Sequence, residues 1–125
     1  MKVAFDIGGV LSKYPDIFRP IVTALEQGGV ECHIVTDMPD RQKTLAMLAA
    51  NGFGMIPESR VHNADYNKHG ELCKSVILRE IGADILIDDH PGYLTEGCPV
   101  RLHMCPDPHT PYDAPSWKKS CDEGI

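Results

Sequence analysis

The sequence lacks a surplus of positive charge, with 12 Lys and Arg against 18 Asp and Glu and a formal net charge of -6. Proteins that bind the phosphate backbone of nucleic acids need an excess of cationic side chains, so this balance argues against a nucleic-acid partner. No apolar run approaches the length of a membrane span. The first apolar stretch, residues 3–11, is interrupted by Asp6 and two glycines, unlike the core of a signal peptide. We therefore expect a cytoplasmic protein without a membrane partner.

Paired cysteine motifs are also absent. The 5 cysteines are odd in number and irregularly spaced, which favours reduced thiols over a disulfide framework. Cys98, His103, Cys105 and His109 lie near one another in the sequence, but they lack the C-x₂-C spacing that is typical of structural zinc sites. Zinc is therefore not expected, and the sequence contains no internal repeat.

Apolar segments of strand length alternate with amphipathic segments of helix length. Strands are predicted at residues 2–5, 31–36, 60–63, 84–87 and 99–104, and helices at residues 16–27, from 39 to about 51, and 71–81. This alternation is typical of βαβ units. The expected fold is an α/β, Rossmann-like three-layer sandwich with a mainly parallel five-stranded sheet. Residues 1–105 would form this domain, and the proline-rich residues 106–125 would form an irregular tail.

The periodicity also predicts which apolar residues of each helix face the core. They are Ile17, Phe18, Ile21, Val22 and Leu25 in the first helix, Leu45, Leu48 and Ala49 in the second, and Leu72, Val76, Ile77 and Ile81 in the third.

Acidic residues stand at the ends of two predicted strands. Asp6 follows the first strand, and Asp88 and Asp89 follow the strand at 84–87. In parallel sheets, ligands bind at the carboxyl ends of the strands, near the switch in strand order. Clustered carboxylates raise one another's pKa unless a cation compensates, and oxygen ligands of this kind suit Mg²⁺. The sequence therefore predicts a magnesium site here, where a carboxylate can also attack phosphorus.

Four elements of the sequence resemble motifs of the haloacid dehalogenase-like (HAD-like) hydrolases. Residues 3–12 (VAFDIGGVLS) resemble the first motif, an apolar strand followed by Asp-x-Asp-Gly. Residues 33–37 (HIVTD) resemble the second motif, and residues 85–94 (ILIDDHPGYL) resemble the fourth. Lys74, at the start of the preceding helix, is the candidate for the lysine of the third motif, and Lys68 competes with it.

The resemblance implies a Mg²⁺-dependent phosphomonoester phosphatase that acts through an aspartyl phosphate on Asp6. The implied metal ligands are Asp6, the backbone carbonyl of Gly8, Asp88 and Asp89. The implied phosphate-binding residues are Thr36, Asp37 and Lys74, of which Thr36 and Lys74 would join Asp6 in catalysis. The substrate would be a phosphorylated small molecule, such as a nucleotide, or a phosphorylated macromolecule.

Two of these residues also have a structural interpretation. Thr36 or Asp37 could cap the helix that starts near Pro39, because Thr and Asp are common N-cap residues. Only residues 12–15 separate the first motif from its helix, so we expect no cap domain. In the family that the motifs resemble, an open site of this kind implies a large substrate, or a lid lent by a partner or a second subunit. The proline-rich tail could also cover it.

Gly8 departs from the family pattern, because HAD-like phosphatases usually have a second Asp there as general acid and base. A glycine still supplies a carbonyl ligand, but general acid–base help worth about 10²–10⁴-fold is lost. His90, Asp37 and Asp16 are candidate substitutes.

The departure at Gly8 keeps a second hypothesis open. The chain could be a catalytically weak HAD-like domain that binds metal or phosphate and acts through a protein partner. A receiver-type phosphoacceptor domain is disfavoured, since it would place the acidic pair after the first strand and the acceptor Asp after the third.

Overall fold

The computed structural model describes residues 1–93 and the short segment 101–103. The expected tail at 106–125 lies outside these residues. So do Cys98, Cys105, His109 and the side chain of His103, whose arrangement was considered for zinc.

A parallel sheet forms the centre of the fold. Its strands are β1 (Lys2–Phe5), β2 (Glu31–Thr36), β3 (Val61–Asn63), β4 (Ile85–Asp88) and β5 (Arg101–His103). They lie in the order β3-β2-β1-β4-β5, and every neighbouring pair is parallel. The predicted α/β class with a parallel sheet is confirmed, and this strand order is compatible with a Rossmann-like fold.

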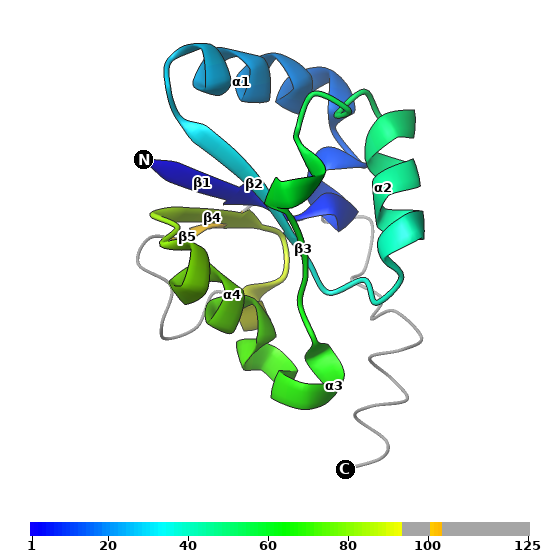
Figure 1. Cartoon of the computed structure of the whole chain (residues 1–125), viewed down its shortest axis with the longest axis vertical. Helices are drawn as coiled ribbons and strands as arrows, with labels where there is room; N and C mark the ends of the chain where they lie inside the picture. Colours follow the sequence, from blue (N-terminus) through cyan, green and yellow to red (C-terminus); the bar gives the residue numbers. More distant parts are fainter. Residues whose placement is uncertain (94–100, 104–125) are drawn as a thin grey trace.

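Helices cover both faces of the sheet, α1 and α2 on one face and α4 with α3 on the other (Figure 1). Their bounds are α1 (Pro15–Gln27), α2 (Arg41–Ala50), α3 (Tyr66–His69) and α4 (Cys73–Ile81). Short helical turns lie at Glu58–Arg60, Gly70–Leu72 and Pro91–Tyr93. The segment Ile7–Leu11 also turns, but its backbone is non-helical at Gly8 and Gly9. The one-turn helix α3 was not predicted, because four residues are too few to show a helical period.

The two faces of β1 divide the core. Val3 and Phe5 belong to the larger apolar cluster, on the side of α1 and α2, whereas Ala4 belongs to the cluster around α4. Phe5 is fully buried and meets the edge of the Phe18 ring at a centroid distance of 6.0 Å. Alternating side chains of one strand thus pack against helices on both faces, which explains the unbroken apolar run from Val3 to Phe5.

The predicted inward faces of the helices were partly wrong. Phe18 and Val22 form the buried seam of α1, but Ile17 and Ile21 are 56% and 40% exposed. Leu72, expected inside, is 53% exposed and precedes α4 in a short turn. Ala49 is also exposed. In α1 and α2 the error arises because an apolar residue next to the buried row fits the helical period as well as one within it. Leu72 differs, since it lies outside α4.

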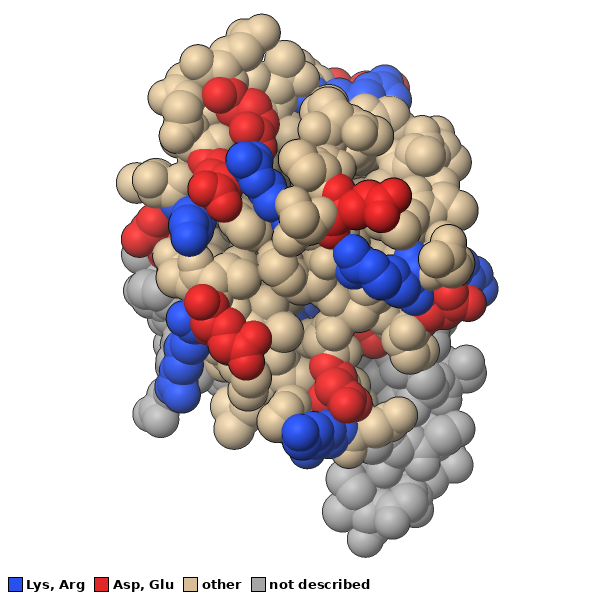
Figure 2. All heavy atoms as spheres, viewed as in Figure 1, with Lys and Arg blue, Asp and Glu red and all other residues tan. Residues whose placement is uncertain are grey.

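No helix in the described part of the chain is long and apolar enough to cross a membrane. On the face drawn in Figure 2, acidic and basic side chains are interspersed rather than gathered by sign.

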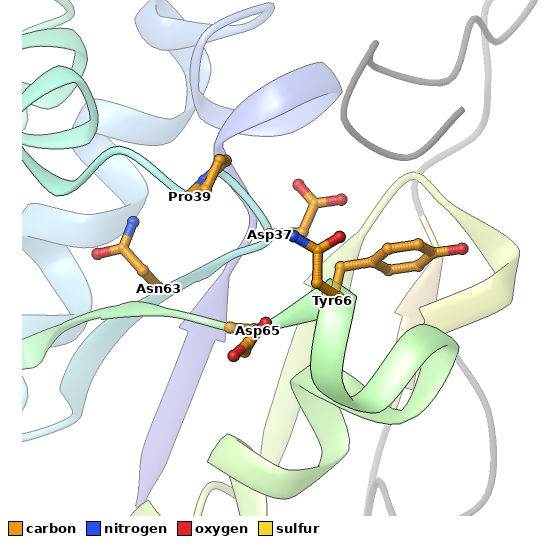
Figure 3. A pocket seen from close by; sticks show the side chains of 7 residues that line it. Asp37, Pro39, Asn63, Asp65 and Tyr66 are labelled. Atoms are coloured by element: carbon orange, nitrogen blue, oxygen red, sulfur yellow. The ribbon is translucent and has the colours of Figure 1, made fainter. Parts of the chain in front are cut away.

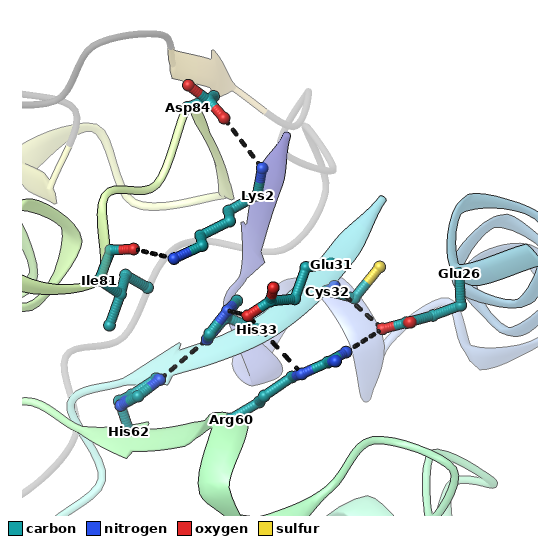
Figure 4. A network of polar contacts seen from close by, with 9 residues as sticks. All are labelled: Lys2, Glu26, Glu31, Cys32, His33, Arg60, His62, Ile81 and Asp84. Atoms are coloured by element: carbon teal, nitrogen blue, oxygen red, sulfur yellow. Dashed lines mark hydrogen bonds and ion pairs between the residues drawn. The ribbon is translucent and has the colours of Figure 1, made fainter. Parts of the chain in front are cut away.

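A polar network links the amino ends of the strands (Figure 4). Glu31 Oε1 lies 2.7 Å from His33 Nε2, and His33 Nδ1 lies 3.0 Å from His62 Nε2. Because a carboxylate only accepts hydrogen bonds, His33 carries a proton on Nε2, and when His33 is neutral its Nδ1 accepts from His62. Burial, the neighbouring His33 and the guanidinium of Arg41 lower the pKa of His62, against a smaller opposing effect of Glu80.

The lowered pKa of His62 predicts that the protein loses stability on mild acidification. The unfolded chain binds the proton more readily than the folded one, so the free energy of unfolding rises with pH in this window. The contribution is complete above the ordinary histidine pKa of about 6.5 and is lost as the pH falls below it. Urea unfolding at about pH 7.5 and about pH 5.5 measures this loss.

The matched variant is His62→Gln, whose side-chain amide can still donate to His33 but does not titrate. We expect a smaller loss of unfolding free energy in this variant than in the wild type over the same pH interval. Equal losses in the two proteins would contradict the assignment to His62.

Candidate functional site

The change in strand order brings two predicted site residues together. From β1 the chain moves outward through β2 to β3, and then β4 pairs with the other side of β1. Asp6 directly follows β1, and its backbone N–H donates to the carbonyl of Ile87 at 3.0 Å. Asp88 is the last residue of β4. Both carboxylates therefore lie at the switch in strand order, where parallel α/β sheets bind ligands.

Asp6, Asp88 and Asp89 form one carboxylate cluster. One oxygen from each lies within 4.8 Å of the others. Asp6 and Asp88 are buried, and Asp89 is half-buried. Asp88 Oδ1 also accepts a hydrogen bond of 2.9 Å from the backbone N–H of His90, which fixes the orientation of that carboxylate.

Lys74 connects the two buried carboxylates. Its Nζ donates to Asp6 Oδ1 at 2.8 Å and to Asp88 Oδ2 at 2.7 Å. The side chain is 1% exposed, and its Nζ lies 4.5 Å from the centroid of the Tyr93 ring. The competing candidate, Lys68, is exposed on α3 and does not belong to this cluster. The structure therefore places Lys74, rather than Lys68, beside Asp6.

The cluster has more negative than positive charge. Burial raises the pKa of Asp6 well above its ordinary value, and Asp88 and Asp89 add to this, although Lys74 opposes it. Burial together with repulsion by Asp88 also raises the pKa of Asp89. Burial works against the charged form of Lys74, but the carboxylates of Asp6 and Asp88 prevail and raise the pKa of its ammonium group. One ammonium thus offsets three carboxylates only in part.

The two glycines after Asp6 differ in what they tolerate. Gly9 has φ = 75°, and a Cβ there would collide with the carboxylate of Asp89. Gly8 has φ = -64° and ψ = 128°, which any residue can adopt, and a Cβ there would have nothing within 4 Å. Glycine is therefore favoured at position 9 first by its positive φ and then by the nearby carboxylate of Asp89, whereas the backbone of Gly8 has room for a side chain.

Thr36 and Asp37 lie at the end of β2, on the same edge of the sheet. Neither caps α2: the N-cap is Asp40, whose carboxylate accepts from the backbone N–H of Lys43 at 3.1 Å. The predicted capping role was therefore wrong for both. Thr36 is buried, and its Oγ1 accepts from the backbone N–H of Met38 at 3.2 Å.

Two proposed substitutes for the missing general acid have structural contacts of their own. Asp16 pairs with Arg19 in the first turns of α1 and is exposed. The ring of His90 packs edge-on against Tyr93 at 4.9 Å, and its Nε2 lies 3.9 Å from Glu71. Neither observation assigns a proton-donating role.

Tyr93 belongs to the site, and sequence reasoning missed its role. It is 1% exposed, and its hydroxyl donates to Asp37 Oδ2 at 2.6 Å. Burial, followed by this hydrogen bond, raises the pKa of the phenol above its ordinary value. Tyr93 therefore contacts Asp37 through its hydroxyl and Lys74 through the face of its ring. An aromatic residue shortly after the acidic pair was the available signal.

Comparison with protein-family models, curated proteins and solved structures found no match to this chain. The interpretation of the site therefore depends on its own residues and geometry.

Replacement of Lys74 by Met should strongly destabilise the protein. It would leave Asp6 and Asp88 buried beside each other without the ammonium group that pairs with both. Breaking a buried ion pair in this way costs about 3–5 kcal/mol. Denaturant unfolding of Lys74→Met against the wild type measures this cost.

Lys68→Met is the matched control, because it makes the same substitution at an exposed position of the neighbouring helix. Its unfolding free energy should stay within about 0.5 kcal/mol of the wild type. A loss in Lys74→Met no larger than that of the control would show that the pairing contributes little to stability.

Proposed function

We propose that this chain is a HAD-like, Mg²⁺-dependent phosphomonoester phosphatase without a cap domain, with Asp6 as nucleophile. The observation that carries the proposal is the bridge from Lys74 to Asp6 and Asp88 at the switch in strand order. A buried ammonium between two carboxylates at a ligand-binding edge is the arrangement that the family resemblance requires. The resemblance of residues 3–12 and 85–94 adds to it.

The donor set fits a divalent cation. Three carboxylate oxygens converge within 4.8 Å, and the ammonium of Lys74 pairs with two of these carboxylates, those of Asp6 and Asp88. Asp6, Asp88, Asp89 and the backbone carbonyl of Gly8 are the residues that would hold Mg²⁺, whose preferred ligands are oxygens. When bound, Mg²⁺ would neutralise negative charge on the phosphoryl oxygens of a substrate.

The side chains of Asp6 and Lys74 have separate roles in the proposed reaction. An Asp6 carboxylate oxygen attacks phosphorus, and the P–O bond to the alcohol breaks with its electron pair on the alcohol oxygen. Lys74 orients Asp6 and places a positive charge beside the phosphoryl group. Water then attacks the aspartyl phosphate, which releases inorganic phosphate and restores the carboxylate of Asp6.

Gly8 determines which substrates react readily. With no carboxyl group at this position, the departing alcohol takes its proton from water, so phosphates with good leaving groups are favoured. The same feature supports the second candidate function, a catalytically weak HAD-like domain that holds metal or phosphate and acts through a protein partner.

The wild-type protein should hydrolyse an aryl phosphate only when Mg²⁺ is present, and Asp6→Asn should abolish this activity. An aryl phosphate has a good leaving group, so it does not need the missing acid, whereas an amide is a poor nucleophile. Release of the phenol with and without Mg²⁺ measures both effects. Mg²⁺ should also raise the melting temperature of the wild type, because it binds only the folded state.

Asp84→Asn is the control for this experiment. This variant makes the same change of a carboxylate to an amide at the opposite end of β4. There the carboxylate of Asp84 accepts a hydrogen bond from the backbone N–H of Lys2 at 2.9 Å. This variant should keep the Mg²⁺-dependent activity. Full activity of Asp6→Asn would assign the hydrolysis to another group and would contradict the proposal.

Gly8→Asp should restore a proton donor and so separate the two candidate functions. The φ of -64° and the open space at Gly8 predict that the fold accepts the new side chain. Hydrolysis of alkyl phosphates, whose leaving groups need protonation, should rise by about 10-fold or more. Hydrolysis of aryl phosphates should change much less.

Gly8→Ala serves as the control, because it fills the same space without a carboxyl group. It should leave the ratio of alkyl to aryl activity unchanged. If Gly8→Asp is folded and binds Mg²⁺ but hydrolyses neither substrate, the partner-dependent function replaces the phosphatase.

A further inference from the structure

Tyr93 lies between the segment after β2 and the first turn of α4, and it contacts a charged side chain of each. Its hydroxyl donates to Asp37 Oδ2 at 2.6 Å, and the face of its ring lies against Lys74, with 4.5 Å between the ring centroid and Nζ. The proposed reaction uses Lys74 directly but does not account for a buried phenol that contacts both groups.

The ring of Tyr93 is held by packing on several sides. The phenol belongs to a small apolar cluster with Ala64, Tyr66 and Cys73, which follow β3, begin α3 and begin α4. The ring of His90 packs against it edge-on at 4.9 Å, and the backbone N–H of Tyr93 donates to the His90 carbonyl at 3.1 Å. Because closely packed side chains have little rotational freedom, the fold determines where the ring face points.

Asp37, which accepts from the phenol, is itself attached to the sheet. It directly follows β2, and it lines the same cavity of about 280 Å³ as Tyr66, at the carboxyl ends of β2 and β3 (Figure 3). Asn63, the last residue of β3, donates to the carbonyl of Met38 at 2.8 Å and so fixes the loop after Asp37. The hydroxyl end of Tyr93 is therefore held at a defined place.

The ammonium of Lys74 depends on its neighbours for its direction. A lysine carries a compact charge on a flexible four-carbon stem. Of its three N–H donors, two go to Asp6 and Asp88 in the described part of the chain. A phosphoryl oxygen at Asp6 would accept from the third. An aromatic face attracts a cation without a conventional hydrogen-bond acceptor, so the ring orients Lys74 and leaves this donor for the phosphoryl group.

We propose that Tyr93 is a positioning residue for Lys74. Its ring directs the ammonium group toward the phosphoryl group, and its hydrogen bond to Asp37 keeps the ring in place. The inference rests on the proposed phosphoryl chemistry at Asp6, and it adds a side chain that acts through Lys74 rather than on the reacting atoms.

Kinetics of the full chain with Mg²⁺ and an aryl phosphate test this role. Tyr93→Phe should lower kcat by about 10-fold, because it removes the hydrogen bond to a charged group that holds the ring. Tyr93→Leu also removes the aromatic face, and its loss should reach about 10²-fold, as for a misplaced reacting group. KM should stay within about 2-fold in both variants, since the ammonium acts on the reacting phosphoryl group. The ring of Phe thus restores part of what Leu loses.

Tyr14→Phe is the matched control. Tyr14 also lies beside a lysine, with 5.7 Å between Lys13 Nζ and the ring centroid, and this pair lies outside the carboxylate cluster. The variant should keep kcat within about 2-fold of the wild type. A loss in Tyr14→Phe equal to that in Tyr93→Phe would overturn the assignment to Tyr93.

Nuclear magnetic resonance tests the orientation of the ammonium without any turnover. The ring current shields protons above an aromatic face, so the Nζ protons of Lys74 should resonate upfield in the wild type. This upfield shift should be lost in Tyr93→Leu and reduced in Tyr93→Phe, while the signals of the exposed Lys68 stay unchanged. A fall in kcat with unchanged Lys74 signals would assign Tyr93 a structural role only and would overturn the inference.

The two measurements separate this inference from the phosphatase function. A wild type that hydrolyses the aryl phosphate, with normal kcat in both Tyr93 variants, would overturn the inference and leave the phosphatase function standing. A wild type without hydrolysis, but with the expected changes in the Lys74 signals, would overturn the phosphatase function. The orientation of Lys74 by Tyr93 would then be supported for the second candidate function, a domain that holds phosphate.

Discussion

The arrangement of the site depends on the contact of one buried ammonium group with two carboxylates. Lys74 comes from the first turn of α4, Asp6 from the end of β1 and Asp88 from the end of β4. A buried Lys is costly unless it is paired, and so are two buried carboxylates next to each other. Burial of each of these groups is therefore compensated by the other two. Two buried carboxylates at the ends of β1 and β4 are stable next to each other because α4 supplies the ammonium of Lys74.

This constraint also explains why the surrounding loops have little freedom. Residue 9 has a positive φ that favours glycine, and the carboxylate of Asp89 occupies the space where a Cβ would lie. Tyr93 packs against the ammonium and binds Asp37, which ties the segment after β4 to the segment after β2. Gly8, in contrast, takes part in none of these contacts, and a Cβ at this position would have nothing within 4 Å.

The sequence predicted the parallel sheet and the convergence of Asp6, Asp88 and Asp89, because both follow from simple periodicity and from the rule that strand ends meet at one edge. Lys74, chosen from the family resemblance and its position at the start of the helix before β4, does lie beside Asp6. The inward face of α1 was predicted only in part. Ile17 and Ile21 are exposed, and they differ from the buried Phe18 and Val22 only in their angle around the helix axis. The role of Tyr93 depends on contacts between residues far apart in the chain, and local patterns do not contain them.

The strand order has a consequence for the order in which the chain folds. β1, β2 and β3 are consecutive, and they share the larger apolar cluster with α1 and α2. β4 must return across the whole of this unit to pair with β1, which closes a long loop and costs more chain entropy than the earlier pairings. We expect Lys74 and Asp88 to reach Asp6 last. During synthesis and folding, the acidic residues would thus stay hydrated until the rest of the core is present to enclose them.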